Sequence, residues 1–75
     1  MRLDINRLKA ERVAKGLSQE EMATKMGWSS RTPYVKRELG IIDIGVDEFL
    51  KIIKILGYTF ERYVNFDSSK LQELT

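Results

Sequence analysis

The sequence predicts an all-α fold made of short helices, and three local patterns carry that prediction. The first is a capping box, in which Ser18 begins a helix and Glu21 follows three residues later. The second is a series of glycines where helices are expected to end, because glycine readily adopts the left-handed conformation that stops a helix. The third is an apolar stripe at helical spacing along residues 45–57.

The first two helices are defined by their ends. Asp4 can cap a helix over residues 5–15, which carries basic side chains in its last turn and stops at the following glycine. The next helix begins after Ser18 and ends at Gly27, so it is only about eight residues long. A helix this short predicts a tight turn directly after it. The side chains expected to face the core are Met22, Ala23 and Met26.

The segment from Gly27 to Gly40, "GWSSRTPYVKRELG", contains the only proline of the chain. An interior proline costs a helix about 3 kcal/mol, but the first turn tolerates it because the N–H groups there have no intrahelical partner. We therefore expect a third helix with Pro33 in its first turn and its end near Leu39. Its cap is expected at Thr32 or, in an earlier register, at Ser29 or Ser30.

This third helix must also bury one face. Leu39, together with Tyr34 or Val35, is expected to face the bundle, and Val35 and Leu39 have the four-residue spacing of a buried pair. Tyr34 has the alternative of turning its hydroxyl outward. Trp28 follows the helix-stopping glycine and is expected to plug the core or its edge.

The fourth helix is expected to form the centre of the core, and Gly45 or Asp47 can cap it. Thr59 can cap a short fifth helix, after which the chain becomes polar. A strand from Tyr63 to Phe66, a helical turn capped by Ser69 and a frayed end are all compatible with the last segment. We therefore assign residues 1–66 to one domain and residues 67–75 to a polar C-terminal tail. The apolar stripe of the fourth helix consists of Phe49, Ile52, Ile53 and Leu56.

The amino-acid composition excludes several classes of function. The 75 residues include no cysteine and no histidine, which removes thiolate nucleophiles, the usual zinc ligands and the commonest acid–base group. We expect no enzyme, cofactor, metal or small-molecule ligand. No apolar run approaches the roughly 18 residues of a membrane span, and the N-terminus has no signal-peptide core, so we expect a cytoplasmic protein with no membrane partner.

Charge is distributed unevenly along the chain. Residues 1–40 carry nine Lys or Arg and five Asp or Glu, whereas residues 41–75 carry four and six. A surface that binds a polyanion is therefore expected in the first half.

The order of these pieces is a capped helix, "LSQEEMATKMG", a segment ending "KRELG" and an amphipathic helix ending "ILGYT". It resembles the phage repressor and Cro family of helix-turn-helix DNA-binding domains. The resemblance implies a compact five-helix bundle of the lambda-repressor-like type, with a structural ion pair between Arg12 and Glu38. It also implies a transcriptional regulator that binds a double-stranded DNA operator as a homodimer, with its third helix in the major groove.

The resemblance places DNA contacts at the start of the second helix and along the third. Arg31 is the first candidate for a bidentate contact to guanine, with a phosphate contact as the alternative. Lys36 and Arg37 lie about 100° apart on a helix, so one is expected on bases and the other on phosphate. Turn and capping chemistry is the alternative role for the serines and for Thr32. The expected DNA-binding residues are Ser18, Gln19, Ser29, Ser30, Arg31, Thr32, Tyr34, Lys36 and Arg37.

The sequence also contains features that bear on binding strength and on protein partners. The loop "IIDIG" lacks the basic residues that the family often places against phosphate, which predicts modest affinity from one protomer. An aromatic cluster near the C-terminus either forms a dimer interface or closes the small core. The same fold can instead serve as a protein-interaction module, such as an antitoxin or antirepressor partner. The cluster consists of Tyr58, Phe60, Tyr63, Val64 and Phe66.

Overall fold

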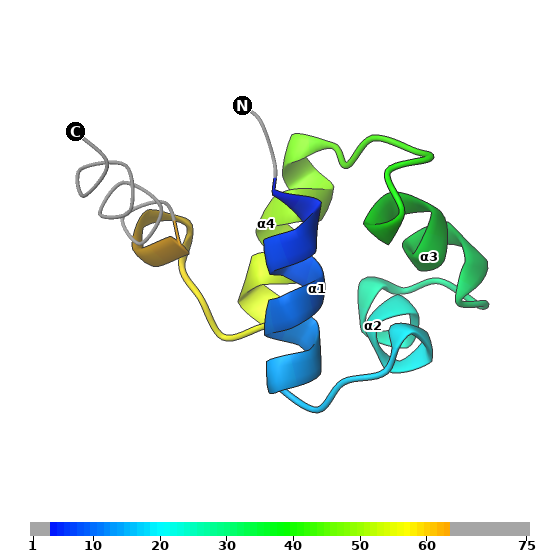
Figure 1. The fold of residues 1–75 in the computed structure, drawn as a ribbon, viewed down its shortest axis with the longest axis horizontal. Helices are drawn as coiled ribbons and strands as arrows, with labels where there is room; N and C mark the ends of the chain where they lie inside the picture. Colours follow the sequence, from blue (N-terminus) through cyan, green and yellow to red (C-terminus); the bar gives the residue numbers. More distant parts are fainter. Residues whose placement is uncertain (1–3, 64–75) are drawn as a thin grey trace.

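The computed structural model describes residues 4–63, which form four helices and a final helical turn (Figure 1). Residues 60–63 are helical up to the last described residue, and no strand occurs within the described range. The all-α prediction is therefore confirmed, whereas Val64, Phe66 and the predicted tail at 67–75 lie outside the described residues. The helices are α1 (Ile5–Ala14), α2 (Gln19–Met26), α3 (Thr32–Glu38) and α4 (Val46–Ile55).

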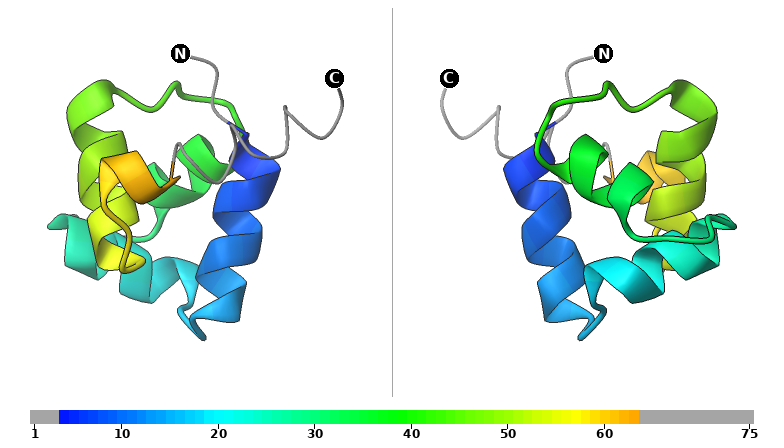
Figure 2. Two further views of the ribbon diagram at one scale, coloured as in Figure 1. Left: turned by 90° about the vertical axis from the view of Figure 1, so that its left-hand side faces the viewer. Right: turned by 90° about the vertical axis from the view of Figure 1, so that its right-hand side faces the viewer.

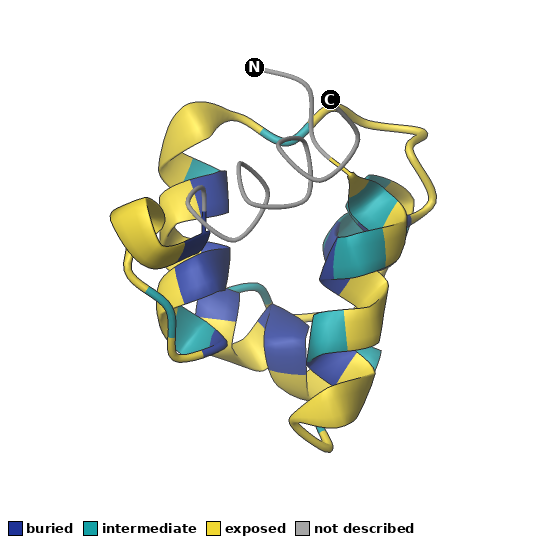
Figure 3. Cartoon of the chain, turned by 60° about the vertical axis from the view of Figure 1, so that its left-hand side comes forward, coloured by how far each residue is buried: buried dark blue, intermediate teal, exposed yellow. Residues whose placement is uncertain are grey.

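The helices enclose one core. α1 and α4 stand on opposite sides of the bundle, and α2 crosses between them at one end (Figure 2). α3 packs against α2 and α1, while α2 also packs against α4. Buried segments of the helices turn toward the centre (Figure 3). Among residues 4–63, no helix is long and apolar enough to cross a membrane.

The predicted start of α1 and both predicted ends of α2 are present. The Asp4 carboxylate accepts hydrogen bonds from two backbone N–H groups of the first turn of α1, each at 3.1 Å. Ser18 Oγ accepts from the Glu21 N–H, and Glu21 Oε1 accepts from the Ser18 N–H, both at 3.0 Å. Gly27 ends α2 in the left-handed conformation, with φ +91°. The chain therefore leaves α2 in a defined direction, toward α3.

The core is built on α4, as predicted. Its four stripe residues are buried, and Gly45 is the residue that precedes the helix. The α2 residues predicted to face inward are buried as well, and Trp28 packs at the edge of the same cluster. Helices α2 and α3 therefore both pack on the apolar core.

The helical turn at 60–63 closes this core. Thr59 Oγ1 accepts from the Arg62 N–H at 3.2 Å, which is the cap expected there. Tyr63 is 4% exposed and meets Phe49 and Tyr58 edge-on, with ring centroids 5.5 Å apart in both pairs. Tyr63 therefore helps to close the core, which is the second of the two roles expected for the aromatic cluster. Phe60 stays 46% exposed.

Candidate nucleic-acid interface

The start of α3 decides where its outward side chains lie. Thr32 is the first helical residue and Pro33 the second, so the proline lies in the first turn, as predicted. The missing N–H of Pro33 costs nothing there, because no intrahelical partner awaits it. The predicted caps are wrong, since Arg31 precedes the helix and no described side chain caps it. Arg31 thus stands at the N-terminal end of α3.

The inward face of α3 includes Tyr34, one of the two expected alternatives, but does not include Leu39. Tyr34 is fully buried and Glu38 is 6% exposed, whereas Leu39 is 64% exposed. The expected pairing of Val35 with Leu39 is therefore wrong, and Tyr34 does not turn its hydroxyl toward DNA. Residues four positions apart lie on the same face of a helix, so Tyr34 faces the core together with Glu38.

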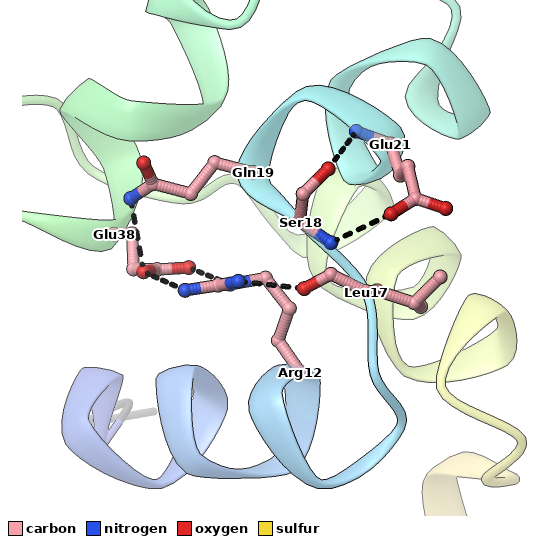
Figure 4. A network of polar contacts seen from close by, with 6 residues as sticks. All are labelled: Arg12, Leu17, Ser18, Gln19, Glu21 and Glu38. Atoms are coloured by element: carbon pink, nitrogen blue, oxygen red, sulfur yellow. Dashed lines mark hydrogen bonds and ion pairs between the residues drawn. The ribbon is translucent and has the colours of Figure 1, made fainter.

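Glu38 is held by a network that joins three helices (Figure 4). Arg12 Nε and Nη2 donate to the two carboxylate oxygens of Glu38 at 2.9 and 3.1 Å, which forms the ion pair expected between α1 and α3. Gln19 Nε2, from α2, donates to Glu38 Oε1 at 3.2 Å. Arg12 Nη1 also donates to the Leu17 carbonyl at 2.6 Å. Gln19 therefore braces α3 against α2.

The outward side of this region is polar. This polar surface consists of the turn between α2 and α3, the first helical turn of α3, and Lys36 one turn further along. Ser18, at the start of α2, is also exposed, whereas Gln19 is half-buried. The exposed side chains from the expected set on the turn and α3 are Ser29, Ser30, Arg31, Thr32 and Lys36.

Arg37 does not join that surface. Its guanidinium pairs with Glu48 at the start of α4, at 2.9 Å, and its side chain is only 16% exposed. This pairing corrects the expectation that Arg37 lies free for a DNA contact. Glu48 was not among the predicted site residues. Eleven residues separate the pair, so no helical spacing pointed to it.

Comparison with known proteins places this arrangement in a family. The model of a helix-turn-helix family matches residues 8–63, most of the chain. The chain belongs to the repressor/Cro-type helix-turn-helix family. No curated protein and no solved structure matches it. The helix-turn-helix assignment supports a DNA-binding regulatory domain, in which α2 and α3 form the motif.

Within the helix-turn-helix domain, the buried network keeps its charges. Burial acts to raise the pKa of Glu38, but its interactions with Arg12, with the Tyr34 hydroxyl and with Gln19 outweigh burial and hold that pKa below its usual range. The bond to Glu38 in turn raises the pKa of Arg12. Burial, with the neighbouring carboxylate, raises the pKa of Tyr34. The Tyr34 hydroxyl interacts electrostatically with Glu38 and Arg12, but it forms no hydrogen bond of standard geometry with any described residue.

That hydroxyl predicts a tolerated substitution. Tyr34→Phe is expected to change the free energy of unfolding by less than about 1 kcal/mol, because it removes a buried polar atom without breaking a formed hydrogen bond. Tyr34→Ala, which also empties the ring's space, is expected to cost about 3–5 kcal/mol. Urea unfolding measures both. A loss above about 2 kcal/mol for Tyr34→Phe would show that the hydroxyl is bonded in solution.

Proposed function

We propose that the chain is a sequence-specific transcriptional regulator of the phage repressor or Cro type, which occupies a double-stranded operator with α3 in the major groove. The observation that carries the proposal is the division of α3 into two sides. Tyr34 and Glu38 fill the inward side, while Arg31, Thr32 and Lys36 are exposed. A short helix with basic and hydroxyl side chains outward suits base edges and phosphates.

The position of each side chain suggests its role. Arg31 and Thr32 lie at the N-terminal end of α3, which is the end that reaches base edges in helix-turn-helix proteins. Lys36 is one turn further along, and its flexible ammonium suits phosphate as a point charge. The exposed serines Ser18, Ser29 and Ser30 have hydroxyls that suit phosphate oxygens.

These roles predict different binding defects. Arg31→Ala is expected to cost about 1–3 kcal/mol on the operator and to relax specificity at one base pair. Lys36→Ala is expected to weaken operator and random DNA alike and to reduce the slope of log K against log salt by about 0.9. Fluorescence anisotropy at several salt concentrations measures both, with Lys54→Ala on α4 as the control. Equal losses of specificity for the two variants would contradict this division.

We also propose that the regulator acts in the cytoplasm as a homodimer on two half-sites about one helical turn apart. A symmetric protein pair on DNA requires a symmetric operator. From the aromatic cluster, Phe60 has the exposed ring that a partner needs, and Tyr58 is half-buried.

Selection of sites from random duplex DNA by the full chain tests the proposal. Enrichment of an inverted repeat is the expected result and supports DNA recognition and dimer symmetry together. Enrichment of one asymmetric site would reject the dimer alone. No enrichment at low salt and high protein concentration would reject the DNA-binding function.

The protein-interaction module is the second candidate. The observation that favours it is a group of exposed apolar side chains where α3 leads into α4, namely Leu39, Ile41 and Val46. This candidate predicts that a salt-sensitive affinity for DNA is absent.

A further inference from the structure

Arg37 makes contacts with three neighbouring parts of the helix-turn-helix domain. Its Nε and Nη2 atoms donate to Oε1 and Oε2 of Glu48, each at 2.9 Å. Its Nη1 atom donates to the carbonyl of Pro33, one turn back on α3, at 2.8 Å. Its guanidinium carbon lies 4.6 Å from the centre of the Trp28 ring. One side chain thus joins the turn before α3, α3 itself and α4.

Glu48 is held in place from its own side as well. Its Oε1 atom accepts the Gly45 N–H at 3.1 Å, which fixes the carboxylate over the start of α4. The hydrogen bonds from Arg37 lower the pKa of Glu48, so the carboxylate stays charged at neutral pH. A bidentate bond between two planar groups restrains their relative orientation as well as their distance.

We propose that Arg37 is a positioning residue, and that the clamp formed by Arg37, Glu48 and Trp28 sets the orientation in which α3 is presented to DNA. The inference rests on the proposed function. It assigns to Arg37 a role without direct contact to the operator, in place of the base or phosphate contact expected from the sequence.

The length of α3 explains why such a clamp matters. α3 has seven residues, about two turns, and a helix this short derives its stability from packing rather than from its own hydrogen bonds. Glu38 fixes one side of α3 through Arg12 and Gln19. Arg37 is the adjacent residue and lies about 100° around the helix, so its bonds to α4 oppose rotation about the Glu38 contact.

Charge gives a second argument. A phosphate contact by Arg37 would have to replace two hydrogen bonds of 2.9 Å to a carboxylate. While it is paired with Glu48, the guanidinium has its charge compensated and releases no counterion from DNA. The clamp and the direct contact therefore predict opposite effects for Glu48→Gln. If Arg37 acts through the clamp, loss of Glu48 weakens specific DNA binding. If Arg37 contacts DNA directly, loss of Glu48 frees its guanidinium and strengthens binding.

The test compares binding to the selected operator with binding to a random duplex over a range of salt. The variants are Arg37→Gln, Arg37→Lys, Glu48→Gln and the double glutamine variant. The clamp predicts that each single variant lowers the operator-to-random affinity ratio about tenfold, the loss typical of one faulty base pair. It also predicts that the double variant is no worse than the singles and that the salt slope of Arg37→Gln stays at the wild-type value. Arg37→Lys is expected to lower the affinity ratio as much as Arg37→Gln, because an ammonium group cannot make the bidentate pair of hydrogen bonds that a guanidinium makes.

Three results would overturn the clamp. One is a salt slope reduced by about 0.9 in Arg37→Gln, as for a lost phosphate contact. Another is full binding by Arg37→Lys, which keeps the charge. The third is tighter, still specific operator binding by Glu48→Gln. Circular dichroism checks that each variant is folded. Lys54→Gln on α4 is the control for removing an exposed charge, and Lys36→Gln is the comparison that is expected to show the reduced salt slope of a lost phosphate contact.

Trp28 allows a readout that needs no DNA, because it is the only tryptophan in the sequence. In the free protein, Arg37→Gln and Glu48→Gln are each expected to shift Trp28 fluorescence, while Lys36→Gln leaves it unchanged. Unchanged emission in both clamp variants would overturn the contact itself. If the emission shifts but the wild type binds no duplex at low salt, the proposed function fails and the inferred role of the clamp in DNA recognition fails with it. A specific wild type with unaffected Arg37 variants rejects the inference alone.

Discussion

Replacement of Glu38 by alanine is expected to lower the free energy of unfolding by about 3–5 kcal/mol, because it leaves the Arg12 guanidinium buried without its counter-charge. The side chains of Arg12 and Glu38 are 10% and 2% exposed, so water does not readily take over the lost bonds. Gln19 loses its acceptor at the same time. A loss of this size approaches the whole stability of a small domain.

Urea unfolding at neutral pH, followed by circular dichroism, measures the effect. Glu20→Ala is the matched control, since Glu20 is an exposed carboxylate on α2, and it is expected to stay within about 0.5 kcal/mol of the wild type. A loss below about 1 kcal/mol for Glu38→Ala would mean that Arg12 finds water or another acceptor at little cost.

The same carboxylate predicts the direction of the pH dependence. The pKa of Glu38 is lower in the folded chain than in the unfolded chain, so the unfolded chain binds more protons as the pH falls. Its stabilising contribution is therefore complete above the ordinary glutamate pKa of about 4.3 and is lost as the pH falls through the lower folded value. Glu21 and Glu48 also have lowered pKa values. The free energy of unfolding is expected to fall less steeply with acid in Glu38→Gln than in the wild type. The difference between the two curves is the contribution of Glu38.

Replacement of Phe49 by alanine is expected to lower the free energy of unfolding by about 3–5 kcal/mol, because the ring is buried in a cluster with Ile53 and Tyr63 and its removal leaves a cavity. Phe49 is 1% exposed and meets the rings of Tyr63 and Phe60 edge-on, with centroids 5.5 and 6.3 Å apart. Its removal is therefore expected to loosen the helical turn at 60–63 as well as α4.

Leu50 offers the control for this change. It is the next residue on α4 but is 40% exposed, so Leu50→Ala is expected to cost less than about 1 kcal/mol. Urea unfolding compares the two variants, and amide hydrogen exchange reports whether residues 60–63 lose protection in Phe49→Ala. Equal losses for both variants would show that the apolar stripe does not face inward.

The helices that the sequence predicted correctly have local signals. The Ser18–Glu21 capping box and the glycine at the end of α2 each act within one helical turn, so neighbours in sequence are enough to define them. The apolar stripe of α4 is read from spacing alone. Pro33 also restricted α3 to registers that place it in the first turn.

The orientation of α3 could not be obtained from apolar spacing. The prediction turned Leu39 inward and left Tyr34 and Val35 as alternatives beside it, whereas the structure turns Tyr34 and Glu38 inward. Glu38 and Leu39 are adjacent residues, about 100° apart on a helix. The inward face contains a charged residue that is satisfied by Arg12 from a distant part of the chain. The expected Arg12–Glu38 pair already contained the correct orientation, since the residue four before Glu38 is Tyr34.

The role of Arg37 was missed for a related reason. An arginine on a short helix looks the same in sequence whether it contacts DNA or a carboxylate. Its partner Glu48 lies eleven positions further along the chain, a separation with no helical periodicity that would indicate a contact. The bidentate geometry depends on how α3 and α4 pack, which is a property of the assembled fold.

Adjacent residues at the end of α3 attach it to opposite sides of the molecule, Arg37 to α4 and Glu38 to α1 and α2. The supporting and the exposed residues of α3 are therefore different sets. Exchanges at Arg31, Thr32 or Lys36 leave both attachments untouched. For the proposed contacts to DNA, this separation means that changes at the exposed residues can alter operator preference one substitution at a time with little loss of stability. The proposed surface is therefore suited to divergence and to laboratory redesign.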